Sequence, residues 1–246
     1  MLCHIVTIFP EYFTGILKTG VLRIAQEKKI LSISLINLRD FADNSYRTVD
    51  DYPYGGGSGM IMKPEPIFRA VAAIKEEESY IILTSPAGRR FDQNLARELS
   101  QKKHLIFISG RYKGVDERVK YLTNDEISIG DFILSGGEAA CAVILEAVVR
   151  LLPGVVGDEE SIVSDSFVSG ILDAPHYTRP ANYQGYEVPK ILLSGDHEKI
   201  KRWRRKEALR RTLLRRPDLL KNAPLSPEDL RLLEEIKREE GKENQD

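Results

Sequence analysis

Cysteine and tryptophan are scarce in this chain of 246 residues, which contains two cysteines and one tryptophan. Cys3 and Cys141 lie far apart, and neither belongs to a Cys-x-x-Cys pair or stands near a histidine cluster. The sequence therefore indicates neither a disulfide framework nor a structural zinc site. Two buried apolar thiols are the simpler expectation.

Long hydrophobic runs are also absent, and none reaches the roughly 18 uncharged residues that a membrane-spanning helix requires. The N-terminus, MLCHIVTIFPEYF, has neither a basic leader nor a small-residue cleavage site. We therefore expect a cytoplasmic protein without a membrane partner. Hydrophobic residues make up 42% of the chain, which is enough to pack one large or two small domains.

The common phosphate-binding motifs are missing as well. There is no GxxxxGK[ST] sequence, and the run GGGSG lacks the last glycine of GxGxxG and follows the polar segment DDYPY. These absences disfavour a nucleoside triphosphate site and a dinucleotide site. The segment DDYPYGGGSGMIMKP fits either a mobile surface loop or a lid over a flat ligand or base.

The net charge of −1 conceals a strong segregation of charge along the chain. Between Lys199 and Lys221 there are eleven Lys or Arg residues and two acids, whereas Pro227 to Asp246 has eight acids and four bases. One part of the chain therefore carries a concentrated basic patch, which is compatible with a nucleic-acid partner.

The first 152 residues alternate short β-branched runs with helical patterns. The expected strands are LCHIVTIF, ILSISLINL, YIILTS, HLIFISG and DEISIGDFIL. The expected helices are EYFTGILKTGVLRIAQEKK, PEPIFRAVAAIKEEE, FDQNLARELSQKK and GVDERVKYL, with Asp92 and Asp116 near two N-termini. This alternation predicts an α/β fold with a parallel sheet. A further helix, from Glu138 to Leu152, is apolar almost all round and is expected to be buried.

Pro153 ends that helix, and a segment rich in Gly, Pro and Ser follows it. Such a long irregular segment is typical of a domain linker or a functional segment. Helical patterns return beyond Val188, and Ser226 with Pro227 forms a helix start signal. We expect a first domain at 1–160, a linker at 161–175 and a small helical domain at 176–246.

Three glycine-bearing turns are unusual for strand-to-helix connections. They are TSPAG, SGRYKGVDERV and SIGDFILSGGE. Ligands of open α/β sheets gather at the carboxyl ends of the strands, where such turns lie. The backbone of IGDFILSGG has groups that suit an adenine edge, although glycine-rich turns are also common without any function.

Several segments, taken in order, carry a specific resemblance. DYPYGGGSGM, TSPAG, GRYKGVDERV, IGDFILSGGE, RLLPGVVG, DSF and LDAPHYTRP resemble the bacterial tRNA (guanine-N1)-methyltransferase family, the TrmD family of the SPOUT class. The resemblance extends from Met1 to the basic helices. It implies a trefoil knot in the first domain, S-adenosylmethionine as methyl donor, and a homodimer with its active sites between subunits. The implied target is N1 of the guanosine that lies 3′ of the anticodon.

The resemblance also implies which positions contact the cofactor. By position these are Pro86, Gly110, Ile129, Gly130, Asp131, Phe132, Ile133, Leu134, Gly136 and Gly137. Many relatives have Glu where this chain has Lys113, which puts an acidic contact to the cofactor's amino group in doubt. Members of the family also depend on Mg²⁺, but the sequence offers no assignable ligand for it.

Methylation of guanine N1 requires a base, because N1 carries a proton at neutral pH. A fixed cation is also needed to stabilise the charge that develops on O6. Asp165 and Arg150 occupy the positions of the family's general base and charge stabiliser. Other interpretations of the same residues are an N-cap at Asp165, for a helix starting at Ser166, and a C-terminal helix cation at Arg150.

The basic helix is expected to track the phosphates of the tRNA anticodon stem-loop, although charge runs are often merely solvated faces. The candidate contacts are His176, Tyr177, Arg179, Arg202, Trp203, Arg205, Lys206 and Arg210, with Arg211, Arg215 and Arg216 continuing the pattern. His176 is also compatible with a packed loop position. Two alternative functions remain: a SPOUT methyltransferase for another RNA position, and a non-catalytic RNA-binding or ribosome-assembly factor.

Overall fold

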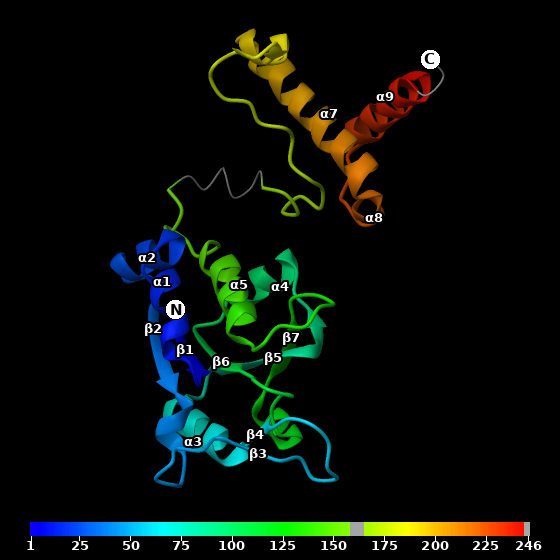
Figure 1. Cartoon of the computed structure of the whole chain (residues 1–246). Helices are drawn as coiled ribbons and strands as arrows, with labels where there is room; N and C mark the ends of the chain where they lie inside the picture. The colour runs from blue at the N-terminus through cyan, green and yellow to red at the C-terminus, as the bar shows by residue number, and fades with distance from the viewer. Residues whose placement is uncertain (158–164, 244–246) are drawn as a thin grey trace. The chain divides into compact units, whose positions relative to one another are not determined.

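The computed structural model describes residues 1–157 and 165–243 (Figure 1). The chain divides into two compact units, residues 1–157 and 158–246. The predicted domain boundary at residue 160 and the start of the predicted linker, 161–164, lie outside the described residues. The domain limits therefore stay a prediction.

A parallel sheet of five strands forms the centre of the first unit, in the order β2-β1-β6-β5-β7. The strands are β1 (Leu2–Thr7), β2 (Ser32–Asn37), β5 (Ser79–Arg90), β6 (His104–Ser109) and β7 (Asp125–Ser128). The predicted α/β fold with a parallel sheet is confirmed. The outer position of β7, beyond β5, means that the chain crosses over one strand between β6 and β7.

Two strands end elsewhere than the sequence predicts. The TSPAG segment lies inside β5, whose pairing with β7 shifts register between Thr84 and Arg89 and then resumes. Gly88 permits this path, because a Cβ there would lie 2.4 Å from the backbone carbon of Glu126. Strand β7 ends at Ser128, so the IGDFIL segment is a loop and not the end of a strand.

The helices of the first unit are interrupted more often than their sequence patterns suggest. They are α1 (Thr14–Leu17), α2 (Gly20–Glu27), α3 (Pro64–Ile74), α4 (Gln93–Ser100) and α5 (Glu138–Val149), with 3₁₀ helices η1 (Pro10–Phe13), η2 (Leu38–Phe41) and η3 (Glu117–Leu122). The expected single helix over 11–29 is broken before Gly20, whose φ is +54°. Asp92 and Asp116 cap α4 and η3, as expected, by accepting backbone hydrogen bonds.

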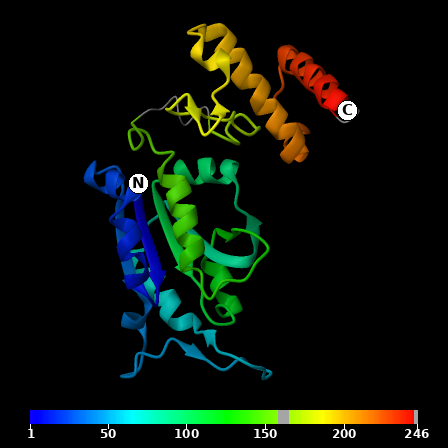
Figure 2. The ribbon, with the colours of Figure 1, turned by 45° about the horizontal axis from the view of Figure 1, so that its top comes forward.

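Apolar side chains pack on both faces of the sheet. Helices α2, α4 and α5 cover one face, α3 covers the other, and Figures 1 and 2 show α3 on the side away from these three helices. The predicted burial of α5 is confirmed by Ile144, Leu145 and Val148, each fully buried. The thiols of Cys3 and Cys141 are also buried, and burial raises the pKa of Cys3 to about 12.

The second unit is built around helix α7 (His197–Arg215), with α8 (Pro217–Leu220) and α9 (Pro227–Glu243). A hairpin of β8 (Asn182–Tyr183) and β9 (Tyr186–Glu187) and the 3₁₀ helix η4 (Lys190–Leu193) precede α7. The expected start signal of α9 is confirmed, because Ser226 and Asp229 exchange side chain-to-backbone hydrogen bonds as a capping box. In neither described part of the chain is a helix long and apolar enough to cross a membrane.

The segment after residue 164 packs against α7. Ile171 and Ala174 are buried with Leu209 of α7 and with residues of α9. The backbone N–H of Leu172 donates to Oγ1 of Thr212 over 3.0 Å. The described part of the predicted linker therefore shares the core of the second unit.

Candidate functional site

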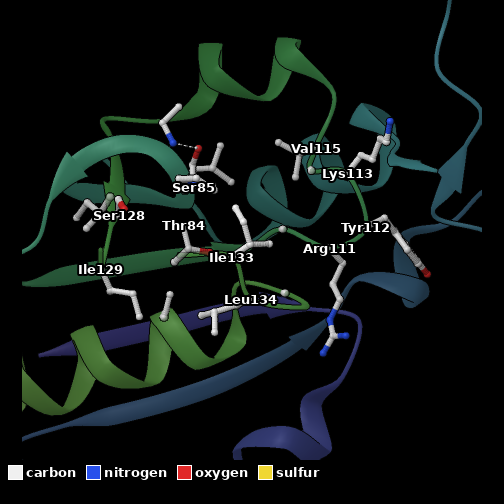
Figure 3. Close-up of a pocket in the computed structure, with 18 of the residues that line it drawn as sticks. Thr84, Ser85, Arg111, Tyr112, Lys113, Val115, Ser128, Ile129, Ile133 and Leu134 are labelled. Atoms are coloured by element: carbon white, nitrogen blue, oxygen red, sulfur yellow. Dashed lines mark hydrogen bonds between the residues drawn. The ribbon is translucent and has the colours of Figure 1, made fainter. Parts of the chain in front are cut away.

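A cavity of about 480 Å³ opens at the carboxyl edge of the sheet, where three chain segments meet. They are the middle of β5 (83–87), the turn after β6 (110–115) and the loop after β7 (127–136). Figure 3 shows Thr84 of β5 close to Ile133 and Leu134 of the loop after β7. The three unusual turns of the sequence thus line one cavity, as the carboxyl-end rule for parallel sheets predicts.

Most of the positions singled out as cofactor contacts line this cavity. Those that do are Pro86, Gly110, Ile129, Gly130, Phe132, Ile133, Leu134 and Gly136. Asp131 and Gly137 are not among the lining residues. Gly137 is needed for another reason: a Cβ on it would lie 2.0 Å from Oγ1 of Thr84, so only glycine lets α5 begin this close to β5.

Other lining residues escaped the sequence-based prediction. Arg111, Tyr112, Lys113 and Val115 belong to the GRYKGV turn, so their proximity to the motif was a usable signal. Lys120 and Ala140 also line the cavity. They lie on η3 and α5, and no local pattern distinguishes them from ordinary helix residues.

The loop after β7 presents apolar side chains to solvent. Phe132 and Ile133 are 53% and 82% exposed, and Leu134 beside them is also exposed. Exposed neighbouring apolar groups at a cavity mouth are typical of a surface that a ligand or another chain covers.

The glycine-rich loop of residues 52–60 connects β3 (Asp50–Asp51) to β4 (Ile61–Met62). Its end is fixed to the cavity wall, because the N–H of Lys113 donates to the carbonyl of Met60 and the N–H of Met62 donates to the carbonyl of Gly114. Tyr52 and Tyr54 at its other end are exposed. The loop is thus attached to a turn that lines the cavity, which favours the interpretation as a lid.

The two proposed catalytic residues lie in different units. Arg150 is the C-cap residue of α5 in the first unit. Asp165 opens the described part of the second unit, in a turn closed by a hydrogen bond between the N–H of Val168 and its carbonyl. Residues 165–170 form bends and turns, so the alternative of a helix N-cap at Asp165 is wrong.

The basic helix α7 has two different faces. The predicted RNA contacts on one face form ion pairs with acidic residues of α9. These pairs are Arg202–Glu235, Arg205–Asp229, Lys206–Glu235, Lys206–Glu239, Arg210–Glu239 and Arg210–Glu240. The Arg205 guanidinium holds the pKa of Asp229 down at about 2, and Lys206 lowers the pKa of Glu239. Much of the charge on this face is thus neutralised within the unit.

The second face of α7 carries exposed cations at helical spacing. Lys201, Arg204, Arg211 and Arg215 follow one another at intervals of three, seven and four residues, and all are exposed. Lys201 and Arg204 line a cavity of about 520 Å³ next to residues 171–174, and Arg202 and Arg205 of the paired face also line it. We call Lys201, Arg204, Arg211 and Arg215 the outer stripe and the paired cations the inner face.

The remaining predicted RNA contacts precede this helix in the chain, apart from Trp203 within it. Nε2 of His176 lies 2.7 Å from Oδ2 of Asp173, and its imidazole is exposed, so the packed-loop alternative does not hold. The rings of Tyr177 and Trp203 are 6.4 Å apart, and Arg179 is exposed. Within residues 1–157 and 165–243, no group of three or more His, Cys, Asp or Glu side chains is arranged to hold a metal ion.

Comparison with known proteins identifies the family. The profile of the family described as tRNA (Guanine-1)-methyltransferase TrmD matches residues 1–222. The chain belongs to this family. A tRNA (guanine-N(1)-)-methyltransferase of Dictyoglomus turgidum is 60% identical over 235 residues, which cover 96% of each chain. Proteins of the same name from Bacillus velezensis and Bacillus subtilis are 54% and 51% identical, over 95% of this chain and 98% of theirs.

The TrmD family match covers both units. It includes the cavity, Arg150, Asp165 and the whole of α7, and it ends before α9 begins at Pro227. The predicted family membership is thereby confirmed, and a non-catalytic assembly factor is not favoured.

Proposed function

We propose that this chain transfers a methyl group from S-adenosylmethionine to N1 of the guanosine immediately 3′ of the anticodon in tRNA. The observation that carries the proposal is the cavity at the carboxyl edge of the sheet, because the family-like segments TSPAG, GRYKGV and IGDFILSGG together form its walls.

The residues of this cavity fit the proposed cofactor. Its volume of about 480 Å³ falls within the range of small-molecule sites. Part of its wall is exposed backbone, at Gly110, Gly130 and Gly136. Another part is apolar and is formed by Ile129, Ile133 and Leu134. Such walls suit an adenosine moiety, and the cofactor supplies an electrophilic methyl group on its sulfonium sulfur when bound.

The protein must then supply a base and a positive charge. We assign the first role to Asp165, whose carboxylate takes the N1 proton, and the second to Arg150, whose guanidinium stabilises the negative charge that develops on guanine O6. Both residue types match the chemistry that N1 methylation demands.

The outer stripe of α7 is the better candidate for phosphate contacts. The inner-face cations already hold carboxylates, so binding phosphate there would require breaking several ion pairs. Lys201, Arg204 and Arg215 have no ion pair with a described residue, and Arg211 donates only to the backbone carbonyl of Asp173.

We also propose the family's trefoil knot and homodimer, and Phe132 and Ile133 are suited to lie in a covered interface.

The test is methyl transfer to two tRNA transcripts that differ only in the base 3′ of the anticodon, G in one and A in the other. We expect transfer to the G transcript alone, with 1-methylguanosine as the only new nucleoside. Product at another position would favour the alternative SPOUT methyltransferase. Absence of S-adenosylmethionine binding in calorimetry would contradict the cofactor assignment.

A further inference from the structure

A buried carboxylate joins three elements next to the cavity. Glu138 is the first residue of α5 and is only 1% exposed. Its Oε1 accepts a hydrogen bond of 2.9 Å from Oγ1 of Thr7, at the end of β1. Its Oε2 accepts one of 3.1 Å from Nε of Arg111, in the turn after β6. Each carboxylate oxygen therefore has its own donor from a different element.

The two donors are themselves held in place. Thr7 is fully buried, and its Oγ1 accepts a hydrogen bond from the N–H of Phe9. The guanidinium of Arg111 stacks 4.5 Å from the centre of the Phe9 ring. Figure 3 shows the side chains of Arg111, Tyr112 and Lys113 leaving their turn in three different directions. The Arg111 side chain is only 21% exposed, whereas Tyr112 and Lys113 are exposed.

The loop of residues 129–137, which contributes to the cavity wall, ends against this cluster. Gly136 pairs with Arg111 as an isolated antiparallel bridge, and the N–H of Gly137 donates to the carbonyl of Gly110 over 2.8 Å. A Cβ on Gly136 would lie 2.4 Å from Nε of Arg111 and 2.5 Å from Oε2 of Glu138. The end of the loop therefore lies directly on the ion pair, and Gly110, Arg111 and Gly136 also line the cavity.

We propose that Thr7, Arg111 and Glu138 form a buried clamp that positions the loop of residues 129–137 for S-adenosylmethionine binding. A buried ion pair adds little net stability compared with apolar residues of the same size, whereas loss of one partner leaves an uncompensated charge. Such a cluster is therefore better explained by the geometry that it fixes. The inference rests on the proposed function, because the ligand is the proposed methyl donor. Thr7 and Glu138 act as positioning residues.

The test compares single substitutions in the full-length protein. Thr7→Val removes the hydroxyl donor while keeping the shape, and Thr7→Ser restores it. We expect Thr7→Val to raise the Kd for S-adenosylmethionine about tenfold, and Thr7→Ser to change it by less than about twofold. The KM for the cofactor should rise in parallel, with kcat at saturation close to that of the wild type. Glu138→Gln provides a second variant, in which the neutral amide leaves Arg111 without its anionic partner.

Hydrogen exchange of the ligand-free protein supplies a readout that does not depend on activity. The amide of Gly137 should exchange faster in Thr7→Val and in Glu138→Gln, together with neighbouring loop amides. The matched control is Thr212→Val, which removes an equally buried threonine hydroxyl in the second unit. It should leave both cofactor affinity and exchange of the loop unchanged.

Two results would overturn the clamp: folded Thr7→Val protein with wild-type cofactor affinity and loop exchange, or equal effects in Thr212→Val. If the wild-type protein does not bind S-adenosylmethionine, the proposed function fails, and the exchange data still decide whether the three residues hold the loop.

Discussion

The first unit is held mainly by apolar burial, whereas the second combines a small apolar cluster with a dense set of ion pairs. Two large clusters of buried side chains cover the faces of the sheet. Around α7 the described core has seven buried members, and ion pairs to α9 flank it. The stability of the first unit should therefore depend mainly on apolar packing, whereas the stability of the second should respond strongly to salt and pH.

The largest expected effect comes from the two proposed catalytic residues, one from each unit. Asp165→Asn removes the base, and Arg150→Ala removes the stabilising cation. We expect single-turnover methyl transfer to fall by on the order of 10² or more in each case. The measurement is rapid quench at saturating tRNA and cofactor. S-adenosylmethionine affinity should stay close to that of the wild type in Asp165→Asn.

Asp218→Asn is the matched control for the base, because it removes an exposed carboxylate paired with Arg216 in the same unit. Substantial single-turnover activity in Asp165→Asn would remove that residue from the mechanism. A loss in Arg150→Ala that is fully explained by weaker tRNA binding would do the same for Arg150.

The two faces of α7 provide the next test. Replacing Arg204, Arg211 and Arg215 together with Gln should weaken tRNA binding by on the order of tenfold or more, and each lost phosphate contact should lower the salt slope by about one. The matched triple variant replaces Arg202, Lys206 and Arg210 on the inner face. It should lower the melting temperature more than the tRNA affinity. The reverse pattern would favour the inner face as the one that contacts RNA, as the sequence predicts.

The two faces of α7 also show what could not be predicted from the sequence, namely which cations have acidic partners. Arg202, Arg205, Lys206 and Arg210 were predicted to contact RNA because their spacing and density are local properties. Their partners on α9 lie 24 to 33 residues further along the chain. Which cations are neutralised depends on how two helices pack, and composition alone does not contain that information.

The first unit was easier to predict for a related reason. Its strands are short apolar runs, and the carboxyl-end rule brought three distant turns to one cavity. What the pattern missed depends on contacts between elements. Strand β5 continues past Thr84 because Gly88 packs on the backbone of β7, and Glu138 on the apolar helix α5 meets donors more than 25 residues away.

A smaller effect is expected on the stability of the second unit when the pH is lowered. The pKa of Asp229 is about 2 in the folded protein, because Arg205 donates to its carboxylate, against an ordinary value near 3.8. The pKa is depressed, so the stabilisation is present above about pH 4 and is lost as the pH falls toward 2. It amounts to about 2 kcal/mol.

Fluorescence of Trp203, the single tryptophan, reports unfolding of this unit. Asp229→Asn should lower stability at pH 7 and reduce its acid dependence, and an unchanged acid transition would contradict the role of the pair.

The smallest effect is a pH response in the first unit, at the sheet edge opposite the cavity. Nδ1 of His4 lies 2.8 Å from Nε2 of the buried His104, so one ring must keep an unprotonated nitrogen. Burial lowers the pKa of both, and the positive charge of His104 lowers that of His4 further, while Glu76 opposes the shift. A lowered imidazole pKa means that stability is full above about pH 6.5 and declines as the pH falls below it.

Intrinsic amide exchange slows as the pH falls from 7 to 5, but the protection factors of the β1 and β6 amides should decrease over this range, because the unit becomes less stable. His104→Gln should reduce that loss of protection, whereas His197→Gln, which alters an exposed histidine of α7, should not. An equal loss of protection in all three proteins would show that the first unit owes its pH response to other groups. A response confined to the His4 and His104 pair would mean that a single polar contact makes even the apolar unit sensitive to acid.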